Sequence, residues 1–125
     1  MGKVVHITIG TALHVLCAYK KPDMSTSAFA ERIIAYILHH ANTGQCIITG
    51  DFNSDIIQGK SSAILDRLMA CGFTQHVQSP TTDGGTLLDH VYTRNVHVSA
   101  CEVADCYYSY HDTVMLQCDK PGTTE

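Results

Sequence analysis

The fold can be predicted from one segment, Gln45-Cys46-Ile47-Ile48-Thr49-Gly50-Asp51-Phe52-Asn53. Its short apolar run is β-branched and is followed at once by Gly-Asp-Phe-Asn, so the pattern predicts a buried strand that ends on polar side chains. Because side chains alternate along a strand, Asp51 and Asn53 are expected on the same side. An acidic acceptor and a neutral donor at this spacing can hold a phosphate and a metal-bound water. The same triplet is also typical of a strand followed by an Asx-type turn.

Length and composition indicate one compact globular domain. The chain has 125 residues, of which 45% are hydrophobic and 16% charged, which is enough for one core but not for two. Eight Lys and Arg against 12 acidic residues give a net charge of −4, so a polyanionic substrate would need a local basic rim or a metal. No secretory signal and no apolar run near the roughly 20 residues that a bilayer requires are visible. We therefore expect an intracellular protein, of the nucleus or cytoplasm, with no membrane partner.

The six cysteines, at positions 17, 46, 71, 101, 106 and 118, are expected to be buried free thiols. Each lies in an apolar strand or helix pattern, and none forms a Cys-x-x-Cys pair. A zinc site is not expected, because Cys101 and Cys106 are predicted to lie five residues apart on one strand and to face opposite ways.

Apolar periodicity predicts strands and helices in alternation, followed mostly by strands. Besides the central stretch, strands are predicted at residues 4–9, 13–19, 87–93, 96–104 and 113–118, with a short extended segment at 73–78 and helices at 28–41 and 61–71. The predicted fold class is α/β, a mixed β-sheet layered with helices on one face. Two helices can cover only one face, so the other face is expected to have no cover within this chain. Residues 1–118 are expected to form the domain and residues 119–125 a polar C-terminal tail.

Polar side chains gather at the predicted strand ends. They are Tyr19, Asp51, Asn53, Asp89 and His111. A carboxylate within a buried strand, such as that of Asp89, needs a cationic or imidazole partner. A phosphate-cleaving site needs an acid to order water, donors for phosphoryl oxygens and an imidazole oriented by a carboxylate.

Short motifs along the chain carry a resemblance to a known family. The segments are Ala18-Tyr19-Lys20-Lys21-Pro22, Ile48-Thr49-Gly50-Asp51-Phe52-Asn53, Ser79-Pro80-Thr81, Leu88-Asp89-His90-Val91 and Ser109-Tyr110-His111. In this order they resemble the Tyr-x-x-Pro, Gly-Asp-Phe-Asn, Pro-Thr, Leu-Asp-His and Ser-Asp-His segments of the endonuclease/exonuclease/phosphatase superfamily. That superfamily includes apurinic endonucleases, inositol-polyphosphate phosphatases and retrotransposon endonuclease domains. The resemblance covers residues 4–117 but only the C-terminal half or so of a family domain, which implies a partial four-layer α/β/β/α sandwich.

The resemblance implies a divalent-metal-dependent, endonuclease-like phosphodiesterase that uses Mg²⁺ or Mn²⁺ and acts on nucleic acid, with DNA preferred over RNA. Asp51 would order or deprotonate the attacking water, or protonate the leaving group, and would bind the metal. Asn53 would bind the scissile phosphate, and His111, its ring held by Asp89, would contact a phosphoryl oxygen. Further phosphate contacts are expected from Tyr19, Thr81, Lys20 and Lys21. Alternatively, Tyr19 is an ordinary strand-end aromatic residue and Thr81 a turn residue.

Two departures from the family pattern reduce the expected activity. Tyr110 stands where the family has an Asp, and a neutral phenol is a poor ligand for a hard cation. The family's metal-binding Glu and an early Asn have no counterpart. We therefore expect a truncated domain that is weakly active or inactive. One alternative is a non-catalytic remnant or interaction module, which uses its open sheet face to bind a second copy, a missing N-terminal half or another partner. The other is a phosphatase of inositol phosphates or lipids.

Overall fold

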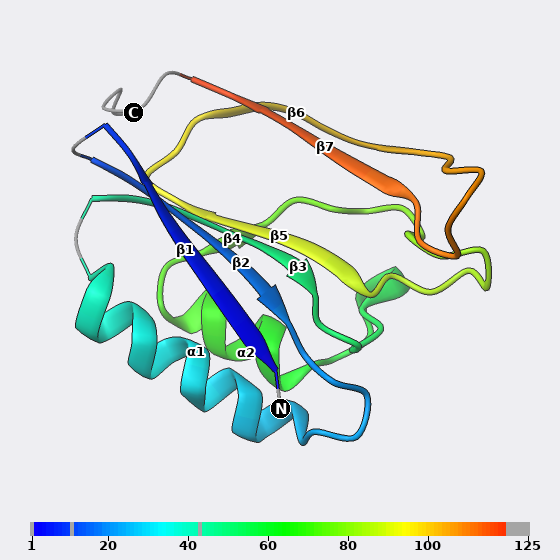
Figure 1. Ribbon diagram of the computed structural model, residues 1–125, viewed down its shortest axis with the longest axis horizontal. Helices are drawn as coiled ribbons and strands as arrows, with labels where there is room; N and C mark the ends of the chain where they lie inside the picture. The colour runs from blue at the N-terminus through cyan, green and yellow to red at the C-terminus, as the bar shows by residue number, and fades with distance from the viewer. Residues whose placement is uncertain (1, 11, 43, 120–125) are drawn as a thin grey trace.

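The computed structural model describes residues 2–10, 12–42 and 44–119, which form two β-sheets and two α-helices (Figure 1). Of the predicted polar tail, only residue 119 lies within the described residues. The elements are β1 (Lys3–Ile9), β2 (Leu13–Tyr19), α1 (Thr26–His40), β3 (Gln45–Asp51), the 3₁₀ turn η1 (Ile57–Gly59), α2 (Ala63–Ala70), β4 (Thr74–Gln75), β5 (Asp89–Arg94), β6 (Val98–Ala104) and β7 (Thr113–Cys118).

The larger sheet is mixed and has the order β1-β2-β3-β5-β4. The central strand β3 runs parallel to β2 and antiparallel to β5, while β1 is an antiparallel edge strand on β2. A parallel pair needs a crossover connection, and α1 lies in the connection between β2 and β3. The predicted α/β class with a mixed sheet is confirmed.

Both helices cover the same face of this sheet (Figure 1). Helix α1 begins two residues earlier than predicted, because the Ser25 side chain accepts a hydrogen bond from the Ala28 N–H and caps it. Its apolar stripe, which includes Phe29 and Ile33, packs with Leu68 of α2 and Ile48 of β3 in one buried core. The helix periodicity therefore predicted the correct face of α1. No helix among the described residues is long and apolar enough to cross a membrane.

The opposite face is covered in part by the β6–β7 hairpin, so the expectation of a wholly uncovered face is wrong. Figure 1 shows this hairpin as a separate layer on the side of the sheet away from the helices. Val103 of β6 and Leu116 of β7 pack on a second core that contains Ile47 and Val91. The sequence showed these strands but not their sheet, because an alternating pattern is the same whether a strand extends a sheet or covers it. The resulting layers are helix, sheet and sheet, as in part of an α/β/β/α sandwich.

The cysteines are free, as predicted, but they are not all buried. Cys46 in β3 is buried, and burial raises the pKa of its thiol to about 11, whereas Cys17 and Cys71 are exposed. Cys106 lies beyond the end of β6, so it does not share a strand with Cys101. In the described part of the chain, one group of three or more potential ligands is close enough to hold a metal ion, and it contains no cysteine.

Candidate active site

Three strand ends bring polar side chains into one row across the larger sheet. In the strand register, Tyr19 of β2 lies beside Asp51 of β3, and Asp51 lies beside Asp89 of β5. Ile47 and Val91 belong to the core on the side away from the helices. Side chains two residues apart share a face of a strand, so Asp51 and Asp89 project toward the same side.

Gly50 permits the close approach of β2 and β3 just before Asp51. Its φ is +147°, and a Cβ at this position would clash with the carbonyl oxygen of Ala18 on the neighbouring strand. Because only glycine lacks a Cβ, the Gly-Asp order places the carboxylate directly beside the end of β2.

His111 completes the row from the loop between β6 and β7. Its Nδ1 lies 2.7 Å from Asp89 Oδ2, and its Nε2 lies 3.4 Å from Asp51 Oδ2. The loop is fixed by a β-bridge between Thr82 and His111 and by the hydrogen bond from the Asp112 N–H to the Thr81 carbonyl, 2.8 Å. The predicted imidazole partner of Asp89 is therefore present. The predicted convergence of Asp51, Asp89 and His111 at one end of the sheet is also confirmed.

The charges of this cluster favour a protonated imidazole between two carboxyl groups. The hydrogen bond to Asp89 raises the pKa of His111, burial opposes it, and the charges of Asp89, Asp51 and Asp112 raise it further. Burial raises the pKa of Asp51 as well, although the Asn53 N–H opposes this shift. A carboxyl group beside an imidazole is a geometry in which protons can be exchanged with a bound water or leaving group.

Asn53 follows the end of β3 in a turn rather than in the strand. Its φ is +45°, so the alternation argument does not apply to it. Its N–H donates to Asp51 Oδ1 at 2.9 Å, an Asx-type contact that orients the carboxylate. Its side-chain Nδ2 donates to the Lys20 carbonyl, which ties the end of β3 to the end of β2. The second hydrogen of Nδ2 is the donor that a phosphate would use.

Two predicted phosphate ligands have structural roles instead. Lys20 is buried, and its Nζ donates to the carbonyls of Lys21 and Met24 at 3.0 and 2.9 Å, so it closes the loop after β2. Thr81 is also buried, and its hydroxyl accepts the N–H groups of Leu88 and Asp89, both at 3.1 Å. Both side chains are buried and are occupied by these backbone contacts. Tyr19 and Lys21 are exposed.

Asp55 is a positioning residue that the sequence did not reveal. Its Oδ1 accepts the N–H of Leu87 at 2.8 Å and that of Ile57 at 3.1 Å, and its Oδ2 pairs with Lys60 at 2.9 Å. Burial acts to raise its pKa, but the contacts with Leu87 and Lys60 outweigh burial and lower it. Asp55 thus joins the loop after β3 to the segment that enters β5. Its partner lies 32 residues away, and no local pattern indicates such a contact.

His90 supports the site from the helix side of the sheet. It is buried, stacks on Phe52 with 4.9 Å between ring centroids, and places Nε2 2.8 Å from the Ser54 carbonyl. Its Nδ1 lies 2.7 Å from the Tyr92 hydroxyl. Burial lowers its pKa to about 4, so the ring is neutral, with Nε2 as the donor and Nδ1 as the acceptor.

The cluster fits a divalent cation through its oxygen donors. One ligand atom each from Asp51, Asp89 and His111 lies within 4.8 Å of the others. Carboxylates suit Mg²⁺ and Mn²⁺, whereas an imidazole binds a metal only when it is unprotonated. A divalent cation bound here would therefore be held by Asp51 and Asp89 ahead of His111.

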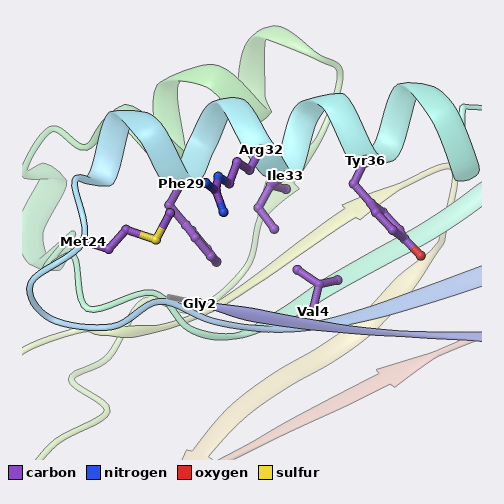
Figure 2. A pocket seen from close by; sticks show the side chains of 7 residues that line it. All are labelled: Gly2, Val4, Met24, Phe29, Arg32, Ile33 and Tyr36. Carbon is purple, nitrogen blue, oxygen red and sulfur yellow. The ribbon is translucent and has the colours of Figure 1, made fainter.

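A separate hollow of about 190 Å³ lies between α1 and β1 (Figure 2). The figure shows Phe29, Ile33 and Tyr36 of α1 pointing toward Val4 of β1. It shares no lining residue with the cluster of Asp51, Asp89 and His111. Helix α1 therefore leaves a gap over the edge strand.

Solved structures share this fold. The endonuclease domain of TRAS1, a telomere-specific non-LTR retrotransposon, has a TM-score of 0.70 and 18% identity, over 90% of this chain and 59% of that chain. A mannosyl-6-phosphatase from Bacteroides thetaiotaomicron has a TM-score of 0.57 and 16% identity, over 86% of this chain and 51% of that one. Neither a family model nor a curated protein sequence matches the sequence.

The fold is thus one that an endonuclease domain and a phosphatase share, as the motifs predicted. The chain spans 59% and 51% of the lengths of the two solved chains, so it corresponds to part of such a domain.

Proposed function

We propose that the chain carries part of the centre of a divalent-metal-dependent phosphodiesterase that acts on nucleic acid, DNA ahead of RNA. The observation that supports this most is the position of His111, which Asp89 holds within 3.4 Å of Asp51. A phosphate-cleaving site needs this combination of an acid, an oriented imidazole and an adjacent amide donor. The endonuclease neighbour favours a nucleic-acid substrate over the other phosphate esters.

Each residue of the cluster has a distinct proposed role. His111, kept protonated by Asp89, donates from Nε2 to a phosphoryl oxygen that enters between His111 and Asp51. Asp51, oriented by the Asn53 N–H, takes a proton from the attacking water or gives one to the leaving group. Asn53 donates its second Nδ2 hydrogen to the phosphate. A divalent cation on Asp51 and Asp89 would supply Lewis-acid stabilisation of the phosphoryl charge.

The surroundings of the cluster support low activity. Several basic side chains are engaged by the protein itself: Lys20 is buried, and Lys60 is paired with Asp55. Arg94 bonds the Ala41 carbonyl and lies over the Phe73 ring. Lys21 after β2 and Lys3, the register partner of Tyr19, are the exposed lysines at this end of the sheet. Tyr110 offers a neutral hydroxyl where the family has a carboxylate.

Plasmid nicking tests this proposal. In millimolar Mg²⁺ or Mn²⁺, we expect the purified chain to convert supercoiled DNA to open circles very slowly or not at all. Tyr110→Asp alone should not raise the rate, because the family's Glu would still be absent. Any residual nicking should disappear in Asp51→Ala. Robust nicking by the wild-type chain that is lost in Asp51→Ala would show that the low-activity part of the proposal is wrong.

A specific observation favours a second candidate function, that of an interaction module. Strand β1 is an edge strand, and Val5, Ile7 and Ile9 project from it with exposed fractions of 57%, 50% and 44%. They lie on the face that the β6–β7 hairpin covers only in part. An exposed edge strand with apolar side chains is a site for pairing with another chain.

The oligomeric state tests this candidate. We expect the isolated chain to form assemblies larger than its 13.7 kDa monomer in size-exclusion chromatography with light scattering at low micromolar concentration. The double variant Val5→Thr/Ile7→Thr removes apolar surface but keeps β-branched residues, so it should shift the population to monomer. A monomeric wild-type chain with a cooperative melt would argue against the interaction module.

A further inference from the structure

The loop between β6 and β7 carries three exposed tyrosines close to the candidate site. Tyr107 is 95% exposed, Tyr108 93% and Tyr110 55%. Single exposed aromatic residues need no explanation, but three within four positions next to a reactive cluster form a surface. Tyrosine rings are rigid and amphipathic, and they bind flat partners at a low cost in conformational entropy.

Tyr110 is held in place by contacts near the end of the loop. The Asp83 N–H donates to the Tyr110 carbonyl at 3.0 Å, and a Cβ at Gly84 would clash with the Tyr110 hydroxyl, so this ring lies directly over the Gly84 backbone. The Tyr110 ring also meets His111 edge-on, with centroids 5.9 Å apart. Tyr108 is three residues from His111, which limits the distance between their Cα atoms to about 11 Å. A ring at this distance can reach a nucleotide next to one whose phosphate is held by His111.

The charges around the tyrosines indicate which part of a nucleic acid they contact. No Lys or Arg occurs between Asn95 and Asp119, and the loop itself contains Asp105 and Asp112. Apart from His111, this surface therefore carries no side chain that would attract phosphates. The neutral faces of nucleobases fit it, because base-aromatic stacking needs no charge on the protein.

We propose that Tyr107 and Tyr108 stack on unpaired nucleobases that flank the phosphate held by the cluster of Asp51, Asp89 and His111. This inference rests on the proposed function only in that the substrate is a nucleic acid, and it does not require catalysis. Bases within a duplex already stack on one another, so the tyrosines select single-stranded or locally unpaired nucleic acid. Because the loop has no Lys or Arg to displace counterions, the affinity should depend less on salt than that of single-strand binders with a basic groove.

A fluorescence titration without metal tests the proposal independently of hydrolysis. The probe is a single-stranded DNA 10-mer with central 2-aminopurine, titrated with protein in EDTA at 50 and 200 mM NaCl. The wild-type chain should change the probe fluorescence saturably, with similar affinity at both salt concentrations, and should bind the matched duplex more weakly. Tyr107→Ser/Tyr108→Ser should weaken binding at least about tenfold, whereas Tyr107→Phe/Tyr108→Phe should bind as the wild type does. Met69→Ser, an exposed position on α2, is the surface control.

A second probe separates stacking from phosphate binding. An oligonucleotide of the same length whose central nucleotides are abasic keeps its phosphates, and we expect it to compete poorly. The inference is overturned if Tyr107→Ser/Tyr108→Ser binds the probe as the wild type does, or if the abasic strand competes as well as the intact one. It is also overturned if the probe fluorescence shows no saturable change, which is the result expected if the tyrosines bind a protein instead. Each of these results leaves the nicking and metal-binding tests unaffected. Stacking without any nicking would support the inference while the catalytic proposal fails.

Discussion

Gly50→Ala is expected to prevent folding of the chain. A methyl group at this position would enter the carbonyl of Ala18 in β2, and the φ of +147° is unfavourable for any residue with a Cβ. The clash is with the backbone of the neighbouring parallel strand, so it cannot be relieved by a side-chain rotation. We expect destabilisation of more than about 4 kcal/mol. Circular dichroism should show no cooperative thermal transition.

Gly59→Ala is the matched control for this prediction. Gly59 also has a positive φ, +80°, but a Cβ there would meet no described heavy atom within 4 Å. Only the conformational strain remains, about 1–2 kcal/mol. If Gly50→Ala melts as cooperatively as Gly59→Ala and at a similar temperature, β2 and β3 do not approach each other closely at Gly50.

Thr81→Val should damage both the stability and the site. The substitution keeps the shape of the side chain but removes the hydroxyl that accepts the N–H groups of Leu88 and Asp89. Leaving two buried donors without an acceptor costs about 2–4 kcal/mol, which urea unfolding would measure. Because Asp89 begins β5 at this point, its carboxylate should also lose its fixed position beside His111.

Thr81→Ser separates the hydroxyl from the methyl group of this side chain. Serine keeps the acceptor, so it should retain most of the lost stability. In NMR spectra of Thr81→Ser, the His111 imidazole signals should match those of the wild type, and in Thr81→Val they should shift. Equal losses of stability in both variants would show that packing, rather than the two hydrogen bonds, explains the role of Thr81.

The sequence predicted the parts of the fold and site that depend on local pattern. The β-branched run before Gly50 indicated β3, and the spacing of Phe29 and Ile33 indicated the buried face of α1. The need of a buried carboxylate for a partner indicated that Asp89 would contact a cation or an imidazole, and motif order pointed to His111. These inferences required no knowledge of which strands are neighbours.

The parts that could not be predicted depend on tertiary arrangement. The alternating pattern of β6 and β7 does not indicate that they form a separate sheet. The partial cover of the larger sheet by this hairpin therefore could not be predicted. Lys20 and Thr81 are buried because loops fold back on them. Their side chains therefore hold these loops rather than face a substrate, which no local pattern indicates. Asn53 was placed by strand alternation, but its positive φ put it in a turn.

Paramagnetic broadening by Mn²⁺ would show whether Asp51, Asp89 and His111 form one metal-binding centre. In the wild-type chain, substoichiometric Mn²⁺ should broaden the His111 imidazole signals while those of His14, which lies beside His6 in the β1–β2 pair, stay sharp. The double variant Asp51→Asn/Asp89→Asn should lose this selectivity, because it removes both carboxylate charges with little change in shape. The claim is contradicted if His111 broadens no more than His14 in the wild type, or if it broadens equally in the double variant.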